Sequence, residues 1–196
     1  MSVRTLHWNK KQIREHLAII EGKKAPSVVL KDATYLNTAL KKWQKANIWI
    51  SDDRIVYVGE EMPEVKAKKV VNCSKRFLVP GYIEPHAHSF FLYNPLSLAK
   101  YAASHGTTTL INDNLILFLQ LPFEKALSII DEFNKLPSSM YWWGRYDSQT
   151  EMENEDLIFS NGKVKGWLSH PSVIQGGELT GWPKVLGGND EILHWM

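Results

Sequence analysis

The sequence predicts an α/β protein in which a small β-domain precedes the first half of a parallel (β/α)8 barrel. From Ser27 to Cys73 short apolar runs recur with the period of two that is typical of half-buried strands. After Arg76 strand-like runs alternate with helical patterns, which is typical of β/α units in a parallel sheet. We therefore expect one domain over residues 1–75 and four β/α units over residues 76–196.

The first predicted element is a helix over residues 9–21. Asn9 followed by Gln12 matches a capping box, and Gly22 suits the position just after a helix end. We expect the helix to pack through an apolar face formed by Ile13, Leu17 and Ile20.

The β-domain is predicted from runs of apolar and β-branched residues separated by polar turns. Ser51-Asp52-Asp53 lies between two such runs, so we expect a tight turn joining a hairpin there. The predicted strands cover residues 27–36, 46–50, 54–59 and 69–73.

The second domain is predicted to hold four parallel strands. A closed barrel of this kind needs eight strands and about 250 residues, so the chain accounts for about half of one. The predicted strands cover residues 77–88, 107–113, 140–145 and 172–178, and the helices between them cover 95–105, 122–136 and a short stretch ending by 170. Tryptophans 142, 143, 167, 182 and 195 indicate a large buried interior or interface in this half.

Composition excludes several classes of protein. The chain of 196 residues is 44% hydrophobic and 22% charged, which is typical of a globular protein. A net charge of +2 is too small to indicate a nucleic acid or a membrane surface as partner. The single cysteine, Cys73, excludes an internal disulfide and a zinc site of paired cysteines. Because no run has the length of a signal peptide core or a membrane span, we expect a cytoplasmic protein.

His86 and His88 are the most informative residues of the chain. They lie one residue apart at the end of an apolar run, and side chains two apart in a strand point to the same face. Neutral imidazole is a common ligand of transition metals, so the pair forms half of a candidate metal site. The remaining histidines lack a partner at useful spacing and are interpreted as surface or packing residues: His7, His16, His105, His170 and His194.

Two carboxylates end neighbouring predicted strands. Barrel enzymes carry their chemistry at the C-terminal ends of the strands, where Asp113 and Glu178 lie. A carboxylate there could reach a metal held by the histidines and bridge to a second metal. Water bound to such a metal loses a proton near neutral pH and becomes a nucleophile. Structural alternatives stay open, namely a turn or helix cap for Asp113 and a loop cap for Glu178.

Four segments resemble parts of known enzymes. Residues 79–88 resemble the first barrel strand of the amidohydrolase superfamily. Residues 106–113 resemble the Gly-Thr-Thr-Thr strand of bacterial adenine deaminases, and residues 177–185 resemble the fourth-strand motif of that family. The hairpin over residues 46–59 resembles part of the β-sandwich that precedes many amidohydrolase barrels. The resemblance covers nearly the whole chain.

This resemblance implies a metal-dependent hydrolase that converts adenine and water to hypoxanthine and ammonia in purine salvage. It implies His86, His88 and Glu178 as metal ligands, and Glu178 and Asp113 as catalytic residues. The cofactor would be a divalent metal centre, binuclear and containing Mn, Fe or Zn. The substrate would be a small purine base, and the full-length protein would be a homo-oligomer. In the family two further histidines and the aspartate that acts as general base come later, so we expect the 196-residue chain alone to be inactive.

Three positions depart from the family pattern. Ser89-Phe90-Phe91 follows the second histidine in place of an acidic residue two positions on, and Asn114-Leu115-Ile116 replaces Pro-His-Glu after Asp113. Lys184 replaces a glycine in the fourth-strand motif. Two alternatives therefore stay open: an amidohydrolase acting on another cyclic amide, imide or amidine, and a non-catalytic truncated protein that serves as an interaction module.

Overall fold

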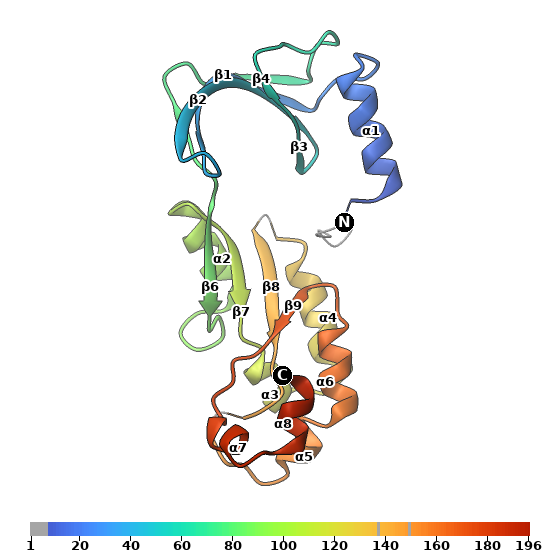
Figure 1. The fold of residues 1–196 in the computed structure, drawn as a ribbon, viewed down its shortest axis with the longest axis vertical. Coiled ribbons are helices and arrows are strands. Elements are labelled where there is room, and N and C mark those ends of the chain that lie inside the picture. Colours follow the sequence, from blue (N-terminus) through green and yellow to red (C-terminus); the bar gives the residue numbers. More distant parts are fainter. Residues whose placement is uncertain (1–7, 137, 149) are drawn as a thin grey trace. The chain divides into compact units, whose positions relative to one another are not determined.

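The computed structural model describes residues 8–136, 138–148 and 150–196. These residues divide into two units, one ending at Pro80 and the other beginning at Gly81, whereas the sequence places the boundary between residues 75 and 76. Each unit is built on a sheet of its own (Figure 1). No helix in the described part of the chain has the length and apolarity needed to cross a membrane.

The first unit contains one mixed sheet of five strands in the order β3-β2-β1-β4, with β5 also paired to β1. The strands β1 and β2 and the strands β2 and β3 are antiparallel, whereas β4 and β5 run parallel to β1. The predicted hairpin is confirmed, since Ser51 pairs with Arg54 across a turn in which Asp52 has a φ of 51°. The predicted sandwich of two sheets stays a prediction. The strand bounds are Val28–Asn37 (β1), Lys42–Ser51 (β2), Arg54–Gly59 (β3), Lys69–Asn72 (β4) and Phe77–Leu78 (β5).

Helix α1 (Lys10–Ile20) begins at the predicted capping box but packs through a different face. The Asn9 side chain accepts the Gln12 N–H at 2.9 Å, and the Gln12 side chain accepts the Asn9 N–H at 3.1 Å. The buried residues of the helix are His16 and Ile19. Ile19 joins the core cluster of the sheet around Trp49. The predicted packing face was wrong, since 42–53% of the surface of its residues stays exposed: Ile13, Leu17 and Ile20.

The strand predicted over residues 77–88 is in fact two strands. β5 belongs to the sheet of the first unit, and β6 (Tyr82–Ala87) begins the sheet of the second. Pro80 and Gly81 separate them, and proline has no N–H to donate to a sheet ladder. A Cβ at Gly81 would collide with the Thr108 side chain, so a glycine is needed for this close approach.

The second unit contains a parallel sheet in the strand order β6-β7-β8-β9. The predicted alternation of strands and helices is confirmed, and helices connect the successive strands because parallel neighbours need a crossover (Figure 1). The remaining strands are Thr107–Asn112 (β7), Ser139–Gly144 (β8) and Val173–Gly176 (β9), and the main connecting helices are Pro95–Ser104 (α2), Phe123–Phe133 (α4) and Asn161–Leu168 (α6).

Several short helices supplement this pattern. α3 was not predicted, because a six-residue apolar run shows no clear period. α5 and α6 divide the segment for which one short helix was predicted. The bounds of the short helices are Leu115–Gln120 (α3), Glu155–Ile158 (α5), Trp182–Leu186 (α7) and Asp190–Trp195 (α8).

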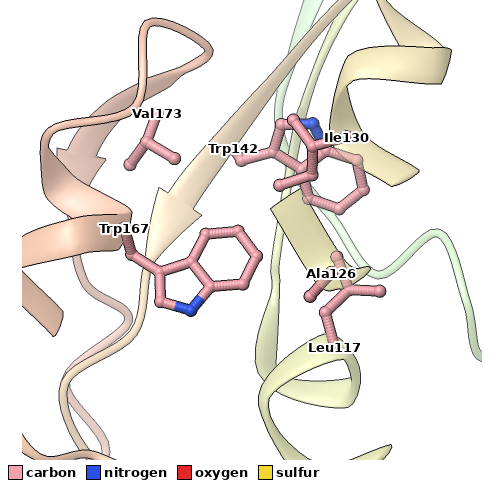
Figure 2. Packing of buried hydrophobic residues seen from close by; sticks show 6 residues of the cluster. All are labelled: Leu117, Ala126, Ile130, Trp142, Trp167 and Val173. Carbon is pink, nitrogen blue, oxygen red and sulfur yellow. The ribbon is translucent and has the colours of Figure 1, made fainter. Parts of the chain in front are cut away.

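The main core of the second unit lies between β8 and the helices α3, α4 and α6. Trp142 of β8 and Trp167 of α6 are almost fully buried in it, beside Ile130 of α4 (Figure 2). The prediction of a tryptophan-rich interior is therefore correct for these two residues and for the buried Trp143. Trp182 does not belong to such an interior, because it is 59% exposed on the short helix α7, and the alternative of an interface stays a prediction for it.

Polar contacts join the segments that follow β8 and β9. The Gly181 N–H donates to Asp147 Oδ2 at 2.6 Å, and Lys184 Nζ donates to Glu155 Oε2 at 2.5 Å. Burial raises the pKa of Asp147 above its ordinary value. Burial also opposes ionisation of Glu155, but hydrogen bonds from Lys184 and Ser148 outweigh it, so the pKa of Glu155 lies below its ordinary value.

We predict that Ile130→Ala destabilises the second unit by about 2–5 kcal/mol, because a fully buried side chain is replaced by a cavity in the core. The control is Leu157→Ala, in which a side chain that is 68% exposed is removed and the change should stay within about 0.5 kcal/mol. Urea unfolding of both variants measures the free energies. Equal changes would contradict the core assignment.

We also predict that the stability of the Asp147→Asn variant, relative to the wild type, increases as the pH rises. The raised pKa means that the folded protein binds a proton more tightly than the unfolded chain. The contribution of Asp147 is therefore fully present below the ordinary pKa of about 3.9 and is lost as the pH rises through the folded pKa. Asparagine keeps an oxygen for the Gly181 N–H and loses nothing with pH. The difference in melting temperature, variant minus wild type, should increase from acid to neutral pH, and a decrease would contradict the prediction.

Candidate metal centre

The two histidines lie at the C-terminal end of β6. His86 is in the strand, and His88 follows its last residue, Ala87. Their Nε2 atoms face each other at 2.9 Å, as expected for residues two apart on one face of a strand. The ring of His86 also packs against Trp143 of β8, with the ring centroids 4.2 Å apart.

Glu178, which follows β9, joins the histidines. Its Oε2 atom lies 3.5 Å from His86 Nε2 and 4.0 Å from His88 Nε2. One ligand atom from each of the three residues lies within 4.8 Å of the other two. The parallel sheet brings them together, because all of its strands, β6 and β9 included, have their carboxyl ends on the same side of it (Figure 1).

Asp113 follows β7 and lies at the other nitrogen of His88. Its Oδ2 atom is 3.8 Å from His88 Nδ1, and its side chain is 3% exposed. Its Oδ1 atom accepts the N–H of Leu115, the first residue of α3, at 2.6 Å. The carboxylate therefore supports the start of a helix, which is the structural alternative raised from the sequence, and also borders the histidine pair.

Arg145 is the residue of the site that the sequence analysis missed. It follows β8, its side chain is fully buried, and it contacts both carboxylates. Its Nε and Nη2 atoms donate to Asp113 Oδ2 at 2.8 and 2.5 Å. Nη2 also donates to Glu178 Oε2 at 2.5 Å, and Nη1 donates to the Glu178 main-chain oxygen at 2.7 Å. The available signal was its position, since residue 145 ends a predicted strand to which no functional residue was assigned.

The other histidines of the described residues do not join this group. His16 is buried beside Trp8, and His170 lies 3.4 Å from the Asp131 carboxylate. His105 is exposed just after α2, and His194 lies in α8. His7 lies outside the described residues.

The three ligand atoms fit a divalent metal ion. Imidazole nitrogen and carboxylate oxygen are donors that zinc, iron and manganese accept. Atoms that each lie about 2.1 Å from one ion are separated by about 3–4 Å. The separations among His86, His88 and Glu178, 2.9, 3.5 and 4.0 Å, agree with this requirement.

Curated relatives cover the whole chain, although no family model matches it. A protein of Halalkalibacterium halodurans named putative adenine deaminase is 61% identical over 191 residues, which are 96% of this chain and 33% of that protein. A putative adenine deaminase of Bacillus subtilis is 49% identical over 198 residues, which are 100% of this chain and 34% of that protein. The chain thus spans about a third of the length of these relatives.

Among solved structures, the chain is similar to an N-acyl-D-glutamate deacylase of Bordetella bronchiseptica. The TM-score is 0.51 and the identity 15%, over 69% of this chain and 35% of that one. This similarity concerns the fold alone. The chain is therefore homologous, over nearly all of its length, to about a third of proteins that are named putative adenine deaminase.

Proposed function

We propose that the chain supplies part of the metal centre of a hydrolytic deaminase that converts adenine and water to hypoxanthine and ammonia. The observation that carries this proposal is the meeting of His86, His88 and Glu178 at the carboxyl ends of the strands of a parallel sheet. The name shared by the relatives supports the choice of adenine as substrate.

We propose further that the parallel sheet is the first half of a (β/α)8 barrel. The strands β6 and β9 are the edges of this sheet in the described residues, and additional strands would pair with them in a closed barrel. The curved sheet of the first unit would belong to the β-sandwich that accompanies such barrels.

Each residue of the site has a proposed role. His86 and His88 would hold a divalent ion from β6, and the Glu178 carboxylate would add a third donor and could be shared with a second ion. When bound, such an ion supplies Lewis acidity that makes water a nucleophile near neutral pH. Asp113 would be a catalytic residue next to His88, because its carboxylate faces the Nδ1 atom of that histidine. The water oxygen would replace the exocyclic amino group of adenine, which leaves as ammonia.

We predict that His86→Ala and His88→Ala lose bound metal. Each variant removes one of the nitrogen donors from the centre. The matched control is His105→Ala, which removes an exposed imidazole just after α2 and should keep the metal content of the wild type. Elemental analysis of the protein at its natural length measures the metal bound per chain. Wild-type metal content in both site variants would contradict the proposed ligands.

We predict that the protein at its natural length converts adenine to hypoxanthine. We also predict that Glu178→Gln lowers kcat about 100-fold or more, because a neutral amide is a weaker metal ligand than a carboxylate and cannot accept a proton as a base. The change in absorbance as adenine becomes hypoxanthine measures the rate. Turnover of a cyclic amide, imide or amidine without turnover of adenine would replace the proposed substrate. No turnover of any of these compounds by a metal-loaded protein would contradict the deaminase.

A further inference from the structure

We infer that Arg145 is a positioning residue of the metal centre, which fixes the Glu178 carboxylate against the two histidines. This inference rests on the metal site of the proposed function. It concerns a residue that would contact neither metal nor substrate and would act through Glu178.

Arg145 holds Glu178 at two points. The Nη1 atom donates to the main-chain oxygen of Glu178, and the Nη2 atom donates to its Oε2. The N–H groups of a guanidinium lie in one plane at fixed angles, so two bonds from one plane define both the place and the direction of this side chain. Oε2 is also the oxygen that lies 3.5 Å from His86 Nε2.

Arg145 is itself held in place by β7 and the residues that follow it. Asp113 accepts from Nε and Nη2, and the Arg145 main-chain N–H donates to Asn114 Oδ1 at 3.0 Å. Asp113 is in turn held by the N–H of Leu115. Hydrogen bonds therefore run without a break from the end of β7 through Arg145 to Glu178 beyond β9.

Charge gives the arrangement a second consequence. Asp113 and Glu178 both bring an oxygen within 2.5 Å of the same nitrogen, Arg145 Nη2. Without the guanidinium these two carboxylates would repel each other, and Asp113 is almost fully buried. Glu178 would then move away from Asp113 and lose its direction toward the histidines. Lysine keeps the charge but lacks the planar set of donors.

Two variants test this role in the protein at its natural length, with Co²⁺ as the probe. Arg145→Lys keeps the charge, and Arg145→Gln combined with Asp113→Asn removes the buried charge pair together, so at least one variant should fold. We expect both variants to bind Co²⁺ about 10- to 100-fold more weakly and to change its visible absorption spectrum. Substitution of a residue that hydrogen-bonds to a metal ligand typically lowers metal affinity by this factor. The matched control, Lys184→Met, breaks the ion pair with Glu155 away from the histidines and should keep wild-type affinity.

Wild-type affinity and an unchanged spectrum in either folded Arg145 variant would overturn the inference. If neither variant folds, a crystal structure of the metal-loaded wild type decides, because the inference requires both bonds from Arg145 to Glu178 to persist there. Adenine turnover is measured in parallel. Weaker Co²⁺ binding in a protein that never converts adenine would reject the proposed substrate and keep the role of Arg145, whereas adenine turnover with unchanged Co²⁺ binding would do the opposite.

Discussion

The buried guanidinium of Arg145 is the constraint on which the candidate metal centre depends. A charged group without access to water is stable only when acceptors meet its donors. Here the acceptors come from the ends of the two strands that flank β8, as Asp113 after β7 and Glu178 after β9. The order of strands in the parallel sheet therefore decides whether this arginine can be buried, and it places Glu178 within reach of the histidines of β6.

The strand β8 links the core to the site. Neighbouring residues of a strand point to opposite faces. Trp142 lies among the residues of α3, α4 and α6, whereas Trp143 packs against the ring of His86. Arg145 begins the segment just beyond. The helices that stabilise one face of the sheet thus also fix the strand whose other face supports the histidine pair.

Much of the fold, and the meeting of the three candidate ligands His86, His88 and Glu178, could be predicted. Strand alternation and strand ends are local properties of the sequence. The spacing of His86 and His88 was enough to place both imidazoles on one face. The role of Arg145 could not be predicted, because it depends on hydrogen bonds to carboxylates that follow other strands, and these contacts are known only once the strand order is known. The packing face of α1 was missed for a similar reason: the core around Trp49 selects Ile19 from several apolar residues.

X-ray absorption spectroscopy of the metal-loaded protein at its natural length tests the central claim most directly, which is that a metal ion binds between the histidine pair and Glu178. The spectrum reports the elements and distances around the ion. The account predicts a shell of nitrogen and oxygen at about 2.0–2.2 Å with the scattering pattern of imidazole rings, which His86→Ala together with His88→Ala diminishes. A wild-type spectrum without imidazole scattering, or one that this double variant leaves unchanged, would contradict it.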